Sequence, residues 1–145
     1  MEKKKYLDCL FLVTKSSKKT YQKLSQTYSA IEPPTWALLL AESTRSVGFE
    51  VNILDANAEN LSEEEILKRI KDVSPRLICL VVYGQNVNAG TTNMSGAIHT
   101  SEYLKKSITT PISIIGSHVQ ALPLETLKAE KSIDFVFTHE DYNHG

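Results

Sequence analysis

Short apolar runs that each end in a polar turn recur along this sequence, and this layout constrains the fold more than any other feature. The clearest example spans residues 112–127, where a β-branched run stops at Gly116, a turn with His118 follows, and Pro123 begins a helix. A short apolar run bounded by turn signals is typical of a buried strand. The same layout follows three other runs, which end at Leu54, Tyr83 and Phe137. Open α/β folds bind ligands where such strands end, so we expect function at these turns.

Strands and helices alternate over the whole chain. Strands are expected at residues 6–13, 50–54, 76–83, 112–115 and 134–137. The run 76–83 is apolar on both faces, which is typical of a central parallel strand. The alternation predicts a three-layer α/β fold, in which helices cover both faces of a parallel sheet. Right-handed crossovers restrict the strand order, and we expect the flavodoxin-like (Rossmann-like) order 2-1-3-4-5 in one domain, residues 1–145.

Local signals mark where the helices begin. Ser62 and Glu65 match a capping box. Leu61 and Ile66, which flank this box, can form a hydrophobic staple. Four helices are expected, beginning at Pro33–Pro34, at Ser62, at Thr91 or Thr92, and at Pro123. The loops expected to meet a ligand are residues 14–32, 55–60, 84–91, 116–122 and 138–141.

Composition and charge exclude several function classes. The net charge is −1, so nothing in the overall charge favours nucleic acid or an anionic membrane as a partner. Seven lysines in the first 25 residues form either a solvated basic start or an anion-facing loop. No apolar span reaches about 18 residues, so no transmembrane helix is expected. Cys9 and Cys79 lie in apolar runs without metal-site or disulfide spacing, and they are expected to be buried, reduced thiols of a cytoplasmic protein.

No catalytic constellation stands out, but two turns contain groups that suit a polar ligand. Asp55, Asn57 and Asn60 offer a carboxylate and two amides in one loop, although Asp and Asn also form local turn hydrogen bonds. Gly84 and Gly90 bracket a second loop, whose backbone amides could hold a phosphate or amide group before a helix start. The spacing is neither GxGxxG nor a Walker loop, so it does not indicate a dinucleotide. The sequence leaves open whether these turns bind a ligand or only form local structure.

Single histidines and aromatic residues also allow two interpretations. His118 is either a ligand contact or a hydrogen-bonded structural residue. His139 and Glu140 follow the last strand and are either ligand contacts or part of a solvated tail. Trp36 and Tyr83 can lie beside a flat ligand or pack in the core. The residues therefore indicate an α/β binding domain and do not name its ligand.

Taken in order, four motifs resemble a known family. They are the Pro-Pro helix from Glu32 to Ser43, V-G-F-E-V-N-I-L-D-A at residues 47–56, G-S-H-V-Q-A-L-P-L-E-T-L at residues 116–127 and D-F-V-F-T-H-E at residues 134–140. Over about residues 33–141, the sequence is similar to the N-terminal cobalamin-binding domain of cobalamin-dependent radical SAM enzymes. Anaerobic magnesium-protoporphyrin monomethyl ester cyclase and many methyltransferases belong to this family.

The resemblance implies a cobalamin-binding module of a methyltransferase- or cyclase-type enzyme, not catalytic alone. The corrin would lie over the carboxyl ends of the strands, and its nucleotide tail would enter between the sheet and the helices. Other cobalamin domains carry Asp-x-His-x-x-Gly, in which the His ligates cobalt. Here Asn57 stands at the His position, so a His-off cobalamin is expected. Cofactor contacts are expected at Asp55, Asn57, Asn60, Tyr83, Gly84, Gly90, Thr91, Gly116, Ser117, His118, Leu122 and Glu140.

The sequence departs from the family's pattern in several respects, which include the loss of Gly-Glu-Gly-Glu after the last strand, where His139, Glu140 and Asp141 stand. It lacks the CxxxCxxC motif, whose three thiolates are needed to hold an iron–sulfur cluster. The cluster and S-adenosylmethionine are therefore expected only in a C-terminal radical SAM domain of a longer parent chain, of which this sequence would be a fragment or an isolated domain. The usual Gly-Gly is Ile115–Gly116 here. Two alternatives stay open, a flavodoxin-like regulatory or nucleotide-binding module without corrin and a ligand-free interaction domain.

Overall fold

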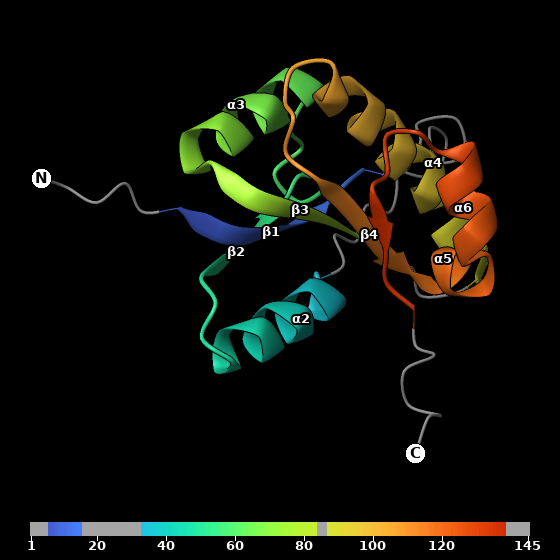
Figure 1. The fold of residues 1–145 in the computed structure, drawn as a ribbon, viewed down its shortest axis with the longest axis horizontal. Coiled ribbons are helices and arrows are strands. Elements are labelled where there is room, and N and C mark those ends of the chain that lie inside the picture. Colours follow the sequence, from blue (N-terminus) through green and yellow to red (C-terminus); the bar gives the residue numbers. More distant parts are fainter. Residues whose placement is uncertain (1–5, 16–32, 84–86, 139–145) are drawn as a thin grey trace, which may run out of the picture.

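The fold is a five-stranded parallel sheet with helices on both faces (Figure 1). The structure is a computed structural model, and it describes residues 6–15, 33–83 and 87–138. Its elements are β1 (Leu7–Val13), α2 (Thr35–Ser46), β2 (Val51–Asp55), α3 (Glu63–Val73), β3 (Pro75–Val82), α4 (Val87–Lys105), β4 (Ile112–Gly116), α5 (Ser117–Ala121), α6 (Pro123–Ala129) and β5 (Phe135–Val136). In the described ranges, no helix combines the length and the apolar character needed to cross a membrane.

The strand order is β2-β1-β3-β4-β5, which confirms the predicted topology. All four pairings are parallel, and β1 lies between β2 and β3. Leu10 of β1, for example, is in register with Asn52 on one side and with Ile78 on the other. Across the sheet, the chain therefore steps in one direction from β1 to β2 and in the opposite direction from β2 to β3, β4 and β5. Because parallel crossovers are right-handed, this reversal places α2 on one face of the sheet and the later helices on the other.

Alternate residues of each strand form two separate cores. Leu10 and Leu12 face the larger core, with α3, α4 and α5, whereas Cys9 and Phe11 face the smaller core, with α2. In the described residues, α2 is the only helix on that second face, and it packs against β1 and β2 (Figure 1). The half of this face that belongs to β3, β4 and β5 is consequently less covered. Phe135 and Phe137 are half exposed there.

The start of α3 follows its sequence signals closely. The Glu65 N–H donates to Ser62 Oγ at 3.2 Å, and the Ser62 N–H donates to Glu65 Oε2 at 2.7 Å. The predicted capping box is therefore confirmed. Leu61 and Ile66 are both buried in the larger core, as a hydrophobic staple requires.

Two of the predicted loops are partly helical, so the sequence-based boundaries were wrong there. The helix expected to begin at Thr91 or Thr92 begins at Val87, and the loop expected over 116–122 contains α5. Extending a helix that is already packed adds one hydrogen bond per residue without a new nucleation cost. Gly90 in the first turns of α4 is tolerated for this reason, at roughly 1 kcal/mol relative to Ala. In α5, the complete burial of Val119 favours a helical turn over a loop.

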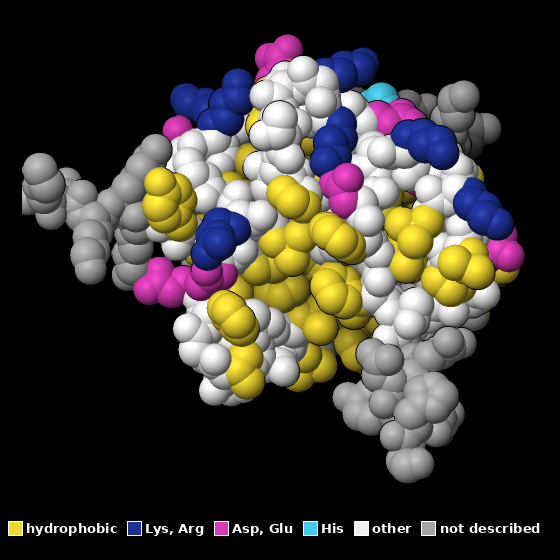
Figure 2. Space-filling view, viewed as in Figure 1, with side chains coloured by type: hydrophobic (Ala, Val, Ile, Leu, Met, Phe, Trp, Pro, Cys, Tyr) yellow, Lys and Arg dark blue, Asp and Glu magenta, His cyan; other side chains and the backbone are white. Residues whose placement is uncertain are grey.

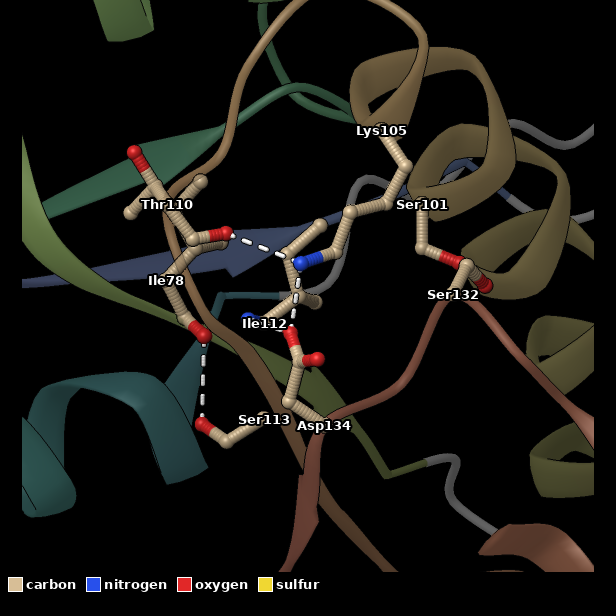
Figure 3. Close-up of polar contacts among 8 residues, drawn as sticks. All are labelled: Ile78, Ser101, Lys105, Thr110, Ile112, Ser113, Ser132 and Asp134. Carbon is tan, nitrogen blue, oxygen red and sulfur yellow. Dashed lines mark hydrogen bonds and ion pairs between the residues drawn. The ribbon is translucent and has the colours of Figure 1, made fainter. Parts of the chain in front are cut away.

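Hydrogen bonds from α4 and β4 hold the segment that leads into the short strand β5 against the sheet (Figure 3). Asp134 Oδ2, just before β5, accepts from Lys105 Nζ and from the Ile112 N–H, the latter at 2.8 Å. Lys105 Nζ also donates to the Thr110 carbonyl at 3.2 Å. Burial acts to raise the pKa of Asp134, but these donors outweigh it and hold the pKa below its ordinary value. The clamp fixes the position of the last strand of the sheet.

Candidate cofactor-binding site

The carboxyl ends of all five strands meet at one edge of the sheet, called the carboxyl edge below. Because the crossovers after β1 and β3 leave to opposite faces, the ends of these two neighbouring strands form a topological switch point. Open α/β sheets bind ligands in the crevice outside such a point. A groove of about 550 Å³ at the opposite edge, between Tyr6, Arg45 and Asp72, lies at the amino ends of the strands. The switch point therefore places the candidate site at the carboxyl edge.

The loop after β2 is stabilised by its own hydrogen bonds. Asp55 Oδ1 accepts from the Ala58 N–H at 3.0 Å, and the Asn60 N–H donates to the Asn57 carbonyl at 3.2 Å. Asn60 has a left-handed φ of 51°, which Asn tolerates better than most residues. The Ala56 N–H ties the loop to the Val13 carbonyl at the end of β1. The structure thus shows the turn role of Asp55, while contacts from this loop to a ligand stay a prediction.

An aromatic pair stands at the switch point. The rings of Trp36, in the first turn of α2, and Tyr83, directly after β3, are stacked with centroids 4.6 Å apart and planes at 26°. Gln120 of α5 donates from Nε2 to the Tyr83 hydroxyl at 3.0 Å. Burial raises the pKa of Tyr83, so the phenol is neutral at physiological pH. Trp36 is 48% exposed, so the stack presents an aromatic surface to solvent as well as packing.

Gln120 is a candidate that the sequence did not indicate. It lies in a segment expected to be a loop, and only the helical turn of α5 brings its amide to Tyr83. No sequence pattern marks such a contact between residues 37 positions apart. Three elements, α2, β3 and α5, thus meet through Trp36, Tyr83 and Gln120.

Gly116 has a structural role that its sequence context did not reveal. A Cβ atom there would overlap the backbone carbonyl of Val82, its register partner in β3. Its φ of 167° is ordinary extended backbone, so the constraint is space and not conformation. The missing side chain therefore permits the β3–β4 pairing at the carboxyl edge, while contact of Gly116 with a cofactor stays a prediction.

The structure describes only some of the other residues that are predicted to contact the cofactor. Ser117 and His118 form the first turn of α5 and are partly exposed, and Leu122, between α5 and α6, is exposed. Gly90 and Thr91 belong to the first turns of α4, but their side chains lie outside the described part of the structure. Gly84, His139 and Glu140 also lie outside the described residues. Contacts of all these residues with a cofactor stay predictions.

An apolar groove runs along the face of the sheet between α2 and β5, and we call it the α2 groove. Figure 2 shows hydrophobic side chains gathered beside α2 in this region. Its volume is about 510 Å³, and its lining residues are Asp8, Cys9, Phe11, Leu40, Thr44, Phe49, Arg76, Leu77, Cys79, Ile115 and Phe137. Leu40 lies one helical turn after Trp36, and Tyr83 packs against the same core that floors the groove. The α2 groove therefore lies near the aromatic pair, which does not itself line it.

Two thiols lie in the floor of the α2 groove. Cys9 and Cys79 are free and buried, as the sequence predicted. Burial raises the pKa of Cys9 to about 11 and that of Cys79 to about 12. Both groups are therefore neutral and behave as small hydrophobic side chains. In the part of the chain that the structure describes, no three His, Cys, Asp or Glu side chains are placed to hold a metal ion.

Comparison with known proteins agrees with this geometry. A family model described as "B12 binding domain" matches residues 22–143, whereas no curated protein matches the chain. One similar solved structure is TsrM, a radical S-adenosylmethionine methyltransferase from Kitasatospora setae, with cobalamin and a [4Fe-4S] cluster bound. Its sequence is 13% identical to this one and the TM-score is 0.63. The match covers 86% of this chain and 21% of the TsrM chain. TsrM with a tryptophan substrate and a SAM analogue gives 16% identity, a TM-score of 0.59, and coverage of 85% and 22%. This chain thus spans about a fifth of TsrM. Since the family model matches most of the sequence, the chain belongs to the B12-binding domain family.

Proposed function

We propose that this domain binds cobalamin as the cofactor module of a larger cobalamin-dependent radical SAM enzyme. The observation that carries the proposal is the family match over residues 22–143, on a fold whose carboxyl edge presents an aromatic surface beside an apolar groove. A flavodoxin-like module without corrin is not favoured, because the family model describes B12 binding. Cobalamin supplies a cobalt centre that can carry a methyl group.

The described residues fit the chemistry of a corrinoid. A corrin has broad apolar faces and a rim of amide side chains. Trp36 and Tyr83 offer apolar surface to a face, while Ser117 and His118 offer hydrogen-bonding groups to the amide rim. Gln120 orients the Tyr83 ring through the phenol hydroxyl. The α2 groove offers an apolar slot for the nucleotide tail, which agrees with a tail that enters between the sheet and a helix.

We further propose that no protein imidazole ligates the cobalt. Asn57 occupies the position at which other cobalamin domains carry the ligating His, and it lies in a turn closed by its own carbonyl. The protein would then hold the cofactor through contacts at the carboxyl edge and in the α2 groove.

The partner would be a C-terminal radical SAM domain in the same parent chain. This proposal is supported by the similarity to TsrM, because this chain covers only 21% of the TsrM chain. The 145 residues contain no CxxxCxxC motif, so the cluster would be held elsewhere. The iron–sulfur cluster and S-adenosylmethionine would bind in that domain, where a methyltransferase or cyclase reaction would take place. Buried free thiols at Cys9 and Cys79 agree with the reducing cytoplasm.

The direct test is retention of hydroxocobalamin by the 145-residue chain. After mixing and desalting, the protein fraction should keep a corrin absorbance that lacks the signature of imidazole on cobalt. Trp36→Leu should weaken retention by roughly tenfold, because the aromatic surface is lost. Phe135→Leu is the matched control, since Phe135 is a half-exposed aromatic that does not line the α2 groove. Folded wild-type protein that retains no corrinoid at micromolar concentrations would contradict the proposal.

A further inference from the structure

The helix α5 is too short to persist without support from its surroundings. It has five residues, whereas isolated helices shorter than about 12 residues are marginal in water. Within the described part of the chain, no side chain caps its start at Gly116. Val119 supplies part of the support, because it is completely buried in the larger core. Gln120, the next residue, supplies a second point of attachment through its hydrogen bond to Tyr83.

This hydrogen bond crosses from one face of the sheet to the other. Val82 at the end of β3 faces the larger core, whereas the following Tyr83 packs against the smaller core beside α2. Val82 is in register with Gly116, so α5 begins next to Tyr83 at the carboxyl edge. The Gln120 amide then spans the remaining distance and donates to the Tyr83 hydroxyl at 3.0 Å. A helix on one face is thereby attached to an aromatic pair whose other member belongs to a helix on the opposite face.

Tyr83 is held through both its ring and its hydroxyl. The ring is stacked on Trp36, with centroids 4.6 Å apart, and the hydroxyl accepts the hydrogen bond from Gln120. Gln120 and Tyr83 are both partly buried, so water competes less for this bond than at an exposed position. A ligand that contacts a mobile side chain has to immobilise it, which reduces affinity, whereas a side chain that is already held adds no such cost.

We propose that Gln120 is a positioning residue that joins the two halves of the candidate site, the aromatic pair on one face of the sheet and the first turn of α5 on the other. This inference rests on the proposed cobalamin function and adds the residue through which both halves are ordered together. While the bond is intact, Trp36 and Tyr83 stay stacked and Ser117 and His118 stay at the carboxyl edge. Without the bond, the Tyr83 ring and α5 move independently, and a bound cofactor would have to order each of them.

A double-mutant cycle on the full 145-residue chain tests this inference, with hydroxocobalamin as the probe and titration calorimetry as the measurement. Gln120→Met keeps the length of the side chain without its amide, and Tyr83→Phe keeps the ring without its hydroxyl. Each should weaken binding by about fivefold, because one partly buried hydrogen bond is lost. The double variant should be no weaker than either single variant, since both changes remove the same bond. Independent losses that multiply to about 25-fold, or no loss in Gln120→Met, would overturn the inference.

Two further readouts need no cofactor. The Leu122 N–H donates to the His118 carbonyl at 3.1 Å, so its hydrogen exchange reports the opening of α5. Trp36 is the single tryptophan of the sequence, so the near-ultraviolet circular dichroism of tryptophan reports the aromatic pair. Gln120→Met should speed the exchange at Leu122 by about fivefold and weaken the tryptophan band, although it removes no atom of Leu122 or Trp36.

Ala121→Met is the matched control, since it places the same side chain at the next, exposed position of α5. It should leave the exchange rate, the tryptophan band and the dissociation constant at their wild-type values. Wild-type exchange and an unchanged tryptophan band in folded Gln120→Met would overturn the inference, whether or not a corrinoid binds. Faster exchange in Gln120→Met, together with a wild-type protein that binds no hydroxocobalamin, would contradict the proposed function while supporting the attachment of α5 through Gln120.

Discussion

Two glycines in this domain are required for different physical reasons. At Gly48 the φ angle is +96°, but no atom lies within 4 Å of the position that a Cβ would take. At Gly116 the backbone is ordinary, but a Cβ would overlap the Val82 carbonyl. Gly48 allows the left-handed backbone conformation at the end of α2. Gly116 allows two buried strands, β3 and β4, to pack closely. A clash with backbone is relieved only if the strands move apart.

Gly116→Ala should therefore destabilise the domain more than Gly48→Ala. We expect about 3 kcal/mol for Gly116→Ala, because overpacking shifts β3 from β4. We expect about 1 kcal/mol for Gly48→Ala, because only backbone strain is added. Urea unfolding of both variants measures the difference, and equal losses would show that the sheet yields easily at Val82. Weak cobalamin binding by a Gly116 variant should accordingly be interpreted as altered sheet packing, and not as a side chain in the corrin space.

At the scale of elements, two residues of the α3 region allow the contribution of a helix cap to stability to be compared with that of core packing. Ser62 closes an exposed capping box, whereas Ile70 is 2% exposed in the larger core. Ser62→Ala should cost about 1 kcal/mol of unfolding free energy. Ile70→Ala should cost about 2–5 kcal/mol, because a cavity is left. Chemical denaturation measures both losses of unfolding free energy. Ser43→Ala, at an exposed position of α2, is the control and should have a small effect. Similar losses for Ser62→Ala and Ile70→Ala would contradict this division.

The elements also show what a sequence can and cannot predict. Strands and their order followed from the apolar runs, since residues 77–82 can only be buried on both faces, and the Ser62 box fixed the start of α3. The start of α4 and the existence of α5 were missed, because burial of Val119 and the packing of α4 outweigh weak local signals. The stack of Trp36 on Tyr83 and the Gln120 hydrogen bond depend on three elements meeting in space. Such contacts leave no local pattern, so the candidate site was only partly predictable.

At the scale of the whole molecule, the clamp at Asp134 links α4, β4 and β5 and couples the last strand to pH (Figure 3). The pKa of Asp134 is lowered in the folded state, so its carboxylate stabilises the fold above the unfolded value of about 3.9. That stabilisation is lost as the pH falls below this value towards the lowered folded pKa, because the unfolded state takes up the proton first. Asp134 is 38% exposed, so the contribution is modest.

Asp134→Asn should therefore cost about 1 kcal/mol at pH 7, and the cost should diminish as the pH falls from about 5 to 3. Asparagine keeps an acceptor for the Ile112 N–H but loses the charge that faces Lys105. Urea unfolding of wild type and variant across this range measures the effect, with Glu42→Gln, an exposed carboxylate of α2, as the control. A cost that stays constant over the range would mean that the Asp134 charge does not stabilise the fold.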